Sequence, residues 1–287
     1  GIPLRSDRIG YQYATPIQGY NSVVLDALKG QFDFVAVHNA YLPFSGDKVH
    51  DEDSLYLSAM AASAVTAEDI AATVKAVRAT APARPVSIAI TEYAPLFTLN
   101  GRASDGYIAS AAAGLYVADM LRLFATIPEV RMANHWSLVG NWHFGAVKGD
   151  GSARPAGEIL ALMRPLAGGK FIPLQIKGPT FTSPGVGFVP PMSALPTITG
   201  AASLNDRLLS IVLINKDPRQ SHSAQLRLPA STLEGAIRAR RFTAGRRFTE
   251  EFQLVDLEVQ ARSAIASINL PPASVTRIDV MLGREPR

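Results

Sequence analysis

The stretch PVSIAITEYAP, residues 85–95, contains an apolar run at 86–91 that predicts a buried β-strand. A carboxylate, Glu92, follows this run at once and is itself followed by Tyr93. A carboxylate without a partner in an apolar interior either costs several kcal/mol or loses its charge. An acid at the end of such a strand therefore indicates a functional site.

Composition describes an ordinary globular chain. The 287 residues are 47% hydrophobic and 18% charged, with a net charge of +4 and no cysteine, which excludes disulfides and thiolate metal sites. No apolar run reaches the length of a membrane span. The compartment stays open between the bacterial cytoplasm and secretion. The densest basic cluster has no aromatic platform beside it, so we interpret it as a solvated face of a strand pair and not as a nucleic-acid patch. It consists of Arg238, Arg240, Arg241, Arg246 and Arg247.

The first part of the chain alternates between strand and helix patterns. The predicted strands are 8–13, 32–37, 86–91 and 130–135, and the predicted helices are 21–29, 66–80, 104–125 and 155–164. Thr66 and Asp69 have the spacing of a capping box, and Gly30 is typical of a helix end. Strands separated by helices in this way predict a parallel sheet.

The composition and the periodicity of the sequence change after Gly169. Proline and glycine become frequent, and short β-type runs occupy 208–214, 224–228, 236–242, 252–259, 264–270 and 274–281. This pattern predicts an antiparallel β-sandwich. We therefore expect an α/β domain over residues 1–169 and a β-sandwich domain over residues 170–287.

Polar and aromatic residues follow three of the four predicted strands. Function in parallel α/β folds lies at the carboxyl ends of strands, and hydrogen-bonding groups beside aromatic faces suit a sugar. The candidate residues are His38, Asn39, Tyr41, Glu92, Tyr93, Asn134 and Trp136. The sequence has no glycine-rich phosphate loop, no nucleophile elbow and no histidine spacing of a zinc site, so we expect no cofactor and no metal. The acidic segment 47–53 leaves calcium open, although a solvated loop is the favoured interpretation.

Three segments together resemble a known family. FDFVAVHNAY, VSIAITEYAP and VRMANHWSLVGN, in that order, resemble strands six, seven and eight of the (β/α)8 barrels of clan A glycoside hydrolases, and most of all the α-L-arabinofuranosidases. LLSIVLINKD and LPPASVTRIDV resemble strands of the sandwich that follows this barrel. The resemblance implies half of a TIM barrel, strands five to eight, followed by an antiparallel β-sandwich.

The family resemblance also implies roles for single residues. Glu92 falls on the catalytic nucleophile at the end of strand seven, and His38 on the histidine that shapes the site at the end of strand six. Tyr41 is shifted by about one residue from the usual aromatic. Asn134 and Trp136 correspond to sugar contacts after strand eight.

The front of the family pattern is missing. The acid/base glutamate of these enzymes follows an asparagine, and the sequence contains no Asn-Glu pair. The resemblance thus implies a retaining arabinofuranosidase, acting on arabinose-containing plant polysaccharides or oligosaccharides, whose first half-barrel lies on another segment or a second chain. We expect a carbohydrate ligand and neither nucleic acid nor membrane as partner.

Three other interpretations remain open. The chain could be a carbohydrate-binding barrel without catalysis, or a β-xylosidase-like enzyme of the same clan. A flavodoxin-like domain fused to a sandwich is the third, although no phosphate-binding loop supports a nucleotide role.

Overall fold

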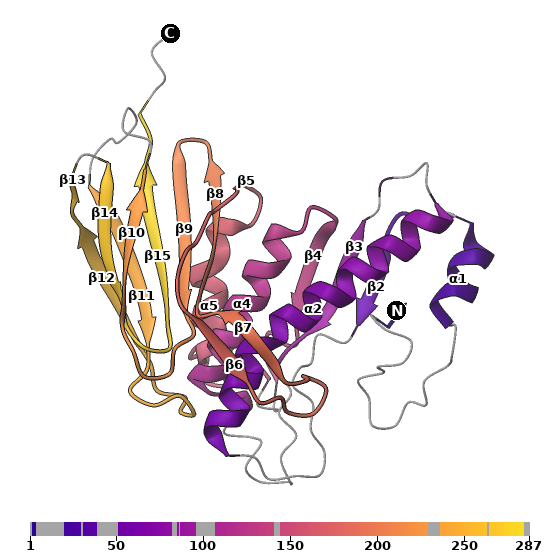
Figure 1. Cartoon of the computed structure of the whole chain (residues 1–287), viewed down its shortest axis with the longest axis horizontal. Helices are drawn as coiled ribbons and strands as arrows, with labels where there is room; N and C mark the ends of the chain where they lie inside the picture. Colours follow the sequence, from indigo (N-terminus) through magenta and orange to yellow (C-terminus); the bar gives the residue numbers. More distant parts are fainter. Residues whose placement is uncertain are drawn as a thin grey trace.

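The computed structural model describes residues 2–3, 20–29, 31–38, 51–81, 85, 87–95, 107–140, 144–228, 236–262 and 264–283. The architecture is a parallel sheet, a layer of helices and a two-sheet sandwich, arranged side by side (Figure 1). This is the predicted half of a (β/α)8 barrel followed by an antiparallel sandwich.

The parallel sheet has the order β1-β2-β3-β4, and within the described part of the chain it does not close into a barrel. Each neighbouring pair is parallel, as the strand–helix alternation predicted. The strands are β1 (Ile2–Pro3), β2 (Val35–His38), β3 (Ile88–Tyr93) and β4 (Val130–His135). The strand beside β2 is thus Ile2–Pro3, whereas the predicted strand 8–13 lies outside the described residues.

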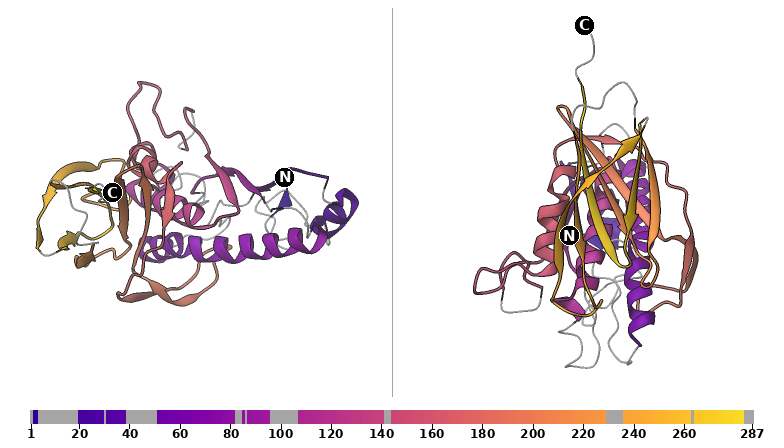
Figure 2. Two further views of the ribbon diagram at one scale, coloured as in Figure 1. Left: turned by 90° about the horizontal axis from the view of Figure 1, so that it is seen from above. Right: turned by 90° about the vertical axis from the view of Figure 1, so that its left-hand side faces the viewer.

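Helices cover one side of this sheet and separate it from the sandwich (Figures 1 and 2). They are α2 (Glu52–Thr80), α4 (Ala111–Thr126), α5 (Pro155–Met163) and the short 3-10 helix η1 (Arg164–Leu166), whereas α1 (Tyr20–Leu28) lies at the end of the molecule away from the sandwich (Figure 1). Ser110 caps α4, and its Oγ accepts the N–H of Ala113 at 3.4 Å. The helix therefore begins later than the predicted 104.

The predicted start of α2 was wrong. The helix begins at Glu52, fourteen residues before Thr66, and the side chain of Asp51 caps it by accepting the N–H of Ser54 at 2.8 Å. Thr66 instead donates its hydroxyl to the carbonyl of Ala62, one turn earlier in the same helix, at 3.0 Å. The end of the segment that we interpreted as a solvated acidic loop is therefore a helix cap and first turn, where negative charge is stabilised.

The sandwich joins a six-stranded sheet, in the order β12-β11-β15-β9-β8-β5, to a three-stranded sheet, in the order β10-β14-β13. All pairs are antiparallel, and β6 and β7 form a separate hairpin. The strands are β5 (Lys170–Ile172), β6 (Thr180–Ser183), β7 (Met192–Pro196), β8 (Ile198–Asn205), β9 (Leu208–Asn215), β10 (His222–Arg227), β11 (Ile237–Thr243), β12 (Gln253–Val259), β13 (Ala261–Arg262), β14 (Ile265–Leu270) and β15 (Ser274–Met281).

The helices and the sandwich share one hydrophobic core. Phe242 of β11 is completely buried in the same cluster as the apolar faces of α2 and α4. The loop between β11 and β12 also closes the start of α4, because the N–H groups of Ala111 and Ala112 donate to the carbonyls of Thr249 and Arg247, both at 2.8 Å. Free N–H groups at a helix start need such acceptors. The sandwich loop is therefore part of the helix layer.

A buried ion pair reinforces this junction. Asp119 of α4 and Lys216, just after β9, are 2% and 3% exposed, and Lys216 Nζ lies 2.6 Å from Asp119 Oδ2. Arg122 Nε donates to Asp119 Oδ1 at 2.9 Å, as does the hydroxyl of Thr199 on β8. Ser63 of α2 donates its hydroxyl to Oδ2 at 2.5 Å. The carboxylate thus ties two helices to the sandwich.

The two partners of this pair respond differently to burial. Burial acts to raise the pKa of Asp119, but Arg122, Lys216 and the hydrogen bonds from Lys216 and Ser63 hold that pKa well below its usual value. The pKa of Lys216 is lowered, because burial and the repulsion of Arg122 outweigh its attraction to Asp119. The carbonyl of Met60 accepts a further hydrogen bond from Lys216 Nζ at 3.1 Å.

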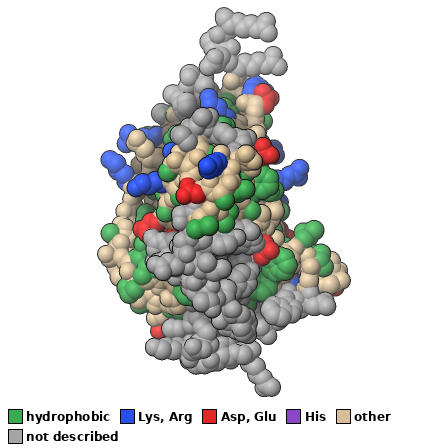
Figure 3. Space-filling model, turned by 90° about the vertical axis from the view of Figure 1, so that its right-hand side faces the viewer, with side chains coloured by type: hydrophobic (Ala, Val, Ile, Leu, Met, Phe, Trp, Pro, Cys, Tyr) green, Lys and Arg blue, Asp and Glu red, His purple; other side chains and the backbone are tan. Residues whose placement is uncertain are grey.

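Hydrophobic side chains reach the surface on the side of the molecule that carries β1 and α1 (Figure 3). Val23 of α1 and Phe34, just before β2, are 67% and 54% exposed. Among the described helices, none combines the length and the hydrophobicity that crossing a membrane requires.

Candidate active site at the carboxyl ends of the parallel strands

The strand ends that carry the predicted site residues meet at one edge of the parallel sheet. β2 ends at His38, β3 at Tyr93 and β4 at His135, and the backbone pairs Tyr93 with His135. The side chain of His38 lies outside the described residues, as do Asn39 and Tyr41. Among the described side chains, this edge therefore brings Glu92 together with the end of β4.

A β-bulge decides which way Glu92 faces. Between the paired positions, β3 advances three residues, from Ile90 to Tyr93, while β4 advances two, from Ala133 to His135. The extra residue lets Tyr93 continue the buried face of Ile90 toward the helices. Because neighbouring side chains of a strand point to opposite faces, Glu92 lies on the face away from α4, where it is half-buried. A strand without the bulge would direct Glu92 into the helix layer.

Tyr93 lies behind the site. Its ring is completely buried and packs edge-on against Phe124 of α4, with ring centroids 5.3 Å apart, and against His135 at 5.5 Å. The ring therefore has no surface to offer a sugar in this structure, although Tyr93 was predicted as a sugar contact. Burial raises the pKa of its hydroxyl, which has no hydrogen-bond partner among the described residues.

The structure adds His135, which was not among the predicted site residues. Its Nε2 lies 3.2 Å from the carbonyl of Phe144, and its Nδ1 is buried without a partner in the described part of the chain. Burial lowers the pKa of His135 to about 4, against a smaller raising effect of the bond to Phe144. The imidazole is thus neutral at physiological pH and supports the strand end without adding charge. The sequence signal was its place between Asn134 and Trp136.

Asn134 and Trp136 lie on the opposite face of β4 from His135. Asn134 is exposed, and the indole of Trp136 is 49% exposed. The backbone N–H of Trp136 donates to the carbonyl of Tyr93 at 2.9 Å, which fixes this strand end beside Glu92. A carboxylate, an amide and an aromatic face therefore share one side of the sheet edge. An aromatic face and hydrogen-bonding groups are what a sugar ring can contact.

The inner face of the sheet continues as an exposed apolar surface. Met132 of β4 is 42% exposed, and Leu138 in the following loop is 71% exposed. The loop itself is held in place, because Ala146 and Val147 donate their N–H groups to the carbonyls of Ser137 and Leu138 at 2.8 and 2.9 Å. In a closed barrel this face would be filled by side chains of the remaining strands.

The described residues form no cluster of three or more acidic or histidine side chains that could hold a metal ion. The chemistry available at the edge is that of a carboxylate nucleophile or base with sugar-binding groups around it.

No protein-family model matches the sequence, and a search of curated proteins found no detectable relative. Solved structures do match. The GH51 arabinofuranosidase from Xanthomonas axonopodis pv. citri has a TM-score of 0.75 at 18% identity, covering 91% of this chain and 55% of its own. An α-L-arabinofuranosidase from Thermotoga maritima has a TM-score of 0.73 at 17% identity, with 92% and 55% coverage.

A xyloglucanase of family 44 from Paenibacillus polymyxa is a more distant match, with a TM-score of 0.59 at 16% identity over 92% of this chain and 51% of its own. The chain therefore has a glycoside hydrolase fold and spans about half the length of the enzymes it matches. At these identities the likeness establishes the fold alone.

Proposed function

We propose that this chain carries the nucleophile of a retaining glycoside hydrolase, that Glu92 is this nucleophile, and that α-L-arabinofuranosides of plant polysaccharides or oligosaccharides are its substrates. The observation that carries the proposal is the bulge in β3, which directs Glu92 away from the helices at the carboxyl edge of the sheet. The match to arabinofuranosidases over more than nine-tenths of the chain supports the choice of sugar.

The reaction would proceed in two displacements. The Glu92 carboxylate attacks the anomeric carbon, the glycosidic C–O bond breaks, and the leaving oxygen takes a proton from a second carboxyl group about 5 Å away. A water molecule then attacks the same carbon and gives its proton to this second group. The sugar leaves and the Glu92 carboxylate is restored. His38, Asn39, Tyr41, Asn134 and Trp136 are proposed to contact the sugar.

The second carboxyl group is proposed to come from polypeptide that completes the barrel, on the same chain or another. Two observations support this. The sequence has no Asn-Glu pair, and Met132 and Trp136 leave apolar surface exposed on the inner face of the sheet. Strands added at β1 and β4, the two ends of the sheet, would cover that face.

A second candidate function is carbohydrate binding without catalysis. The missing Asn-Glu pair favours it, because one carboxylate cannot perform both steps. A β-xylosidase-like specificity is a third candidate, which aryl glycosides with different sugars distinguish.

The test replaces Glu92 by Gln in the assembly that includes the completing half-barrel. Hydrolysis of an aryl α-L-arabinofuranoside should fall by at least about 10³-fold, the scale expected when covalent catalysis is lost. The matched control is Glu129→Gln. Glu129 precedes β4 at the opposite edge of the sheet, where its carbonyl accepts the N–H of Ile88 at 2.8 Å, so activity should stay within about twofold of the parent.

Rescue by azide distinguishes a nucleophile from a residue that only supports the fold. In the Glu92→Ala variant the small anion can enter the vacated space and attack the anomeric carbon, which gives a glycosyl azide and restores turnover. Activity of Glu92→Gln within about tenfold of the parent would remove Glu92 from the chemistry. A parent assembly that binds arabino-oligosaccharides but hydrolyses no aryl glycoside would establish the binding function instead.

A further inference from the structure

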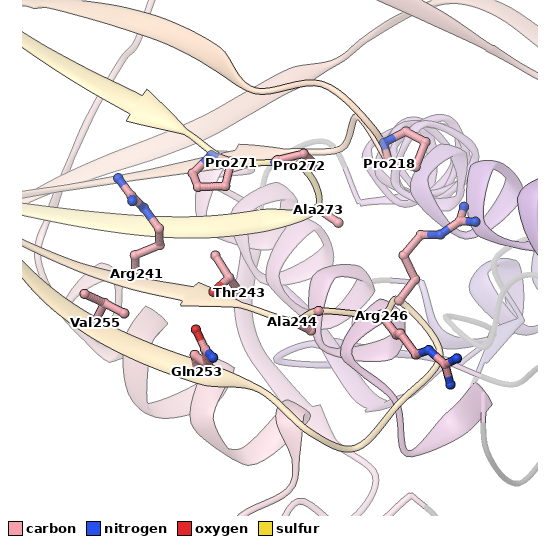
Figure 4. A pocket seen from close by; sticks show the side chains of 12 residues that line it. Pro218, Arg241, Thr243, Ala244, Arg246, Gln253, Val255, Pro271, Pro272 and Ala273 are labelled. Carbon is pink, nitrogen blue, oxygen red and sulfur yellow. The ribbon is translucent and has the colours of Figure 1, made fainter.

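A pocket of about 550 Å³ opens at one end of the sandwich, and Glu92 is not among the residues that line it. It lies between the loop that joins β11 to β12 and the turn formed by Pro271–Ala273. Figure 4 shows Arg241 and Arg246 toward opposite ends of the pocket, with Thr243 and Ala244 between them. None of the twelve described residues that line the pocket is acidic, and three of them are arginines.

Arg241 lacks a carboxylate partner among the described residues. Its Nη2 donates to the carbonyl of Asn269 at 2.6 Å, but its Nε is buried without a partner there. Burial lowers the pKa of the guanidinium, as expected for a charge removed from water without an opposite charge beside it. A buried N–H group without a hydrogen-bond acceptor costs free energy, and this cost disappears when an acceptor enters the pocket.

Arg247 is held rigidly at the other side. Its Nη2 lies 2.5 Å from Asp53 Oδ1, and its guanidinium carbon lies 5.1 Å from the ring centroid of Tyr56 and 5.9 Å from that of Phe248. Its Nη1 is nevertheless buried without a partner in the described part of the chain. Asp53 is shared with Arg219, so one carboxylate faces two arginines and the surplus charge at this end is positive.

Other arginines of the same cluster behave differently. Arg238 and Arg240 of β11 are exposed, and Arg240 Nε lies 3.3 Å from Asp256 Oδ1. For these two side chains the interpretation as a solvated strand face holds. Arg241, Arg246 and Arg247 instead surround a cavity, where planar guanidinium groups can present paired N–H donors to an oxyanion.

We propose that this pocket, lined by Arg241, Arg246 and Arg247, is a second binding site that takes a small ligand bearing an oxyanion, either a carboxylate such as that of a uronic acid or a phosphate group. Three features favour a negatively charged ligand. They are the surplus of positive charge, the buried N–H groups without partners and the lack of acidic residues in the lining. The site is independent of the proposed catalytic function of Glu92.

The experiment titrates the purified protein with sodium D-glucuronate, with inorganic phosphate and with neutral glucose, by isothermal calorimetry at low ionic strength. The variants are Arg241→Gln and Arg246→Gln, and the matched control is Arg240→Gln, which makes the same charge change on the same strand. Arg246 is exposed and has no partner among the described residues, so its replacement should leave the fold intact.

Glucuronate or phosphate should bind, glucose should not, and both pocket variants should weaken anion binding by at least about tenfold. Arg240→Gln should change it by less than about twofold. The anion that binds more tightly identifies the source of the oxyanion. The proposal is overturned if neither anion binds the parent protein, if the two pocket variants bind as the parent does, or if Arg240→Gln weakens binding as much as they do.

Discussion

Replacing Asp119 by Asn should lower the free energy of unfolding more than any substitution of similar size at the surface. The substitution keeps the shape of the side chain but removes the negative charge that faces Lys216 at 2.6 Å and Arg122 at 2.8 Å. Lys216 is 3% exposed, so its ammonium cannot reach water and would remain buried with the carbonyl of Met60 as its other acceptor. Breaking a buried pair in this way costs about 3–5 kcal/mol.

That loss is large against the total stability of a folded protein, which is roughly 5–15 kcal/mol. The ratio of folded to unfolded molecules should fall by about 10²–10³-fold or more, since each 1.4 kcal/mol is a factor of about ten. Urea unfolding at pH 7, followed by circular dichroism, measures it.

The pH dependence has a definite sign. The pKa of Asp119 is lower in the folded protein than in the unfolded chain, so the unfolded chain binds the proton first as the pH falls. The stabilisation by the Asp119 carboxylate is complete above the unfolded pKa of about 3.9 and is lost below it. The difference between parent and Asp119→Asn should therefore be constant from about pH 5 to 8 and shrink below about pH 4.

Two further variants separate the charge effect from packing. Asp256→Asn makes the same chemical change in the exposed pair with Arg240 and should cost less than about 1 kcal/mol. Combining Asp119→Leu with Lys216→Met removes both charges of the pair and should recover part of the loss, because Arg122, Ser63 and Thr199 still lose their acceptor. The reasoning is refuted if Asp119→Asn costs no more than Asp256→Asn.

Two other predictions concern the site and the helix layer. The pKa of His135 is about 4 in the folded protein and about 6.5 in the unfolded chain. The free energy of unfolding should therefore fall by about 2 kcal/mol between pH 7 and pH 5, as the unfolded chain takes up the proton. His135→Asn should abolish this pH dependence in urea unfolding, and equal pH dependence in the variant and the parent would contradict it. Gly157→Ala should destabilise the fold by about 1–3 kcal/mol despite the better helix propensity of alanine, because the added Cβ would lie 2.3 Å from the carbonyl oxygen of Ala146. Gly149→Ala, which meets nothing within 4 Å, is its control, and equal melting temperatures for the two variants would count against the argument.

Much of the order of elements could be predicted from periodicity, whereas the strands between residues 170 and 205, β5 to β8, could not. Of these, β8 is an internal strand of the six-stranded sheet. Strand β8 reads Ile-Thr-Gly-Ala-Ala-Ser-Leu-Asn and lacks the run of branched side chains that marks the other strands. At Gly200 a side chain is excluded, because a Cβ there would lie 2.6 Å from the carbonyl oxygen of Val212. Close approach of two backbones leaves no periodic signal, so this strand was missed. The boundary expected after residue 169 remains a prediction.

The start of α2 was misplaced for a related reason. A capping box is a local pattern, and the Thr66–Asp69 spacing satisfies it wherever it occurs. In the structure the residues before Thr66 are buried by contacts that are distant in the sequence, as when Tyr56 donates its hydroxyl to the carbonyl of Lys216 at 3.0 Å. These contacts extend the helix to residues before the local start signal at Thr66.

The sequence predicted which strand ends carry the candidate site, but it could not predict the face of the sheet to which each side chain points. The run before Glu92 located the acid correctly at the end of a strand. Whether Tyr93 or Glu92 faces the helices depends on a bulge, and a bulge is set by pairing with β4. The packing of His135 beneath Tyr93 follows from the same pairing and could not be read from either segment alone.

The bulge in β3 also specifies how the two strands align. If the strand were regular, Glu92 would follow Ile88 and Ile90 into the apolar layer against α4, and the ring of Tyr93 would turn outward. Both outcomes are costly, the first because it desolvates a carboxylate and the second because it empties a packed position beside Phe124. The adjacent acid and aromatic therefore favour the bulged pairing of β3 with β4 over a straight one. Exchanging the two residues, with Tyr at 92 and Glu at 93, would reverse that preference and favour the straight strand.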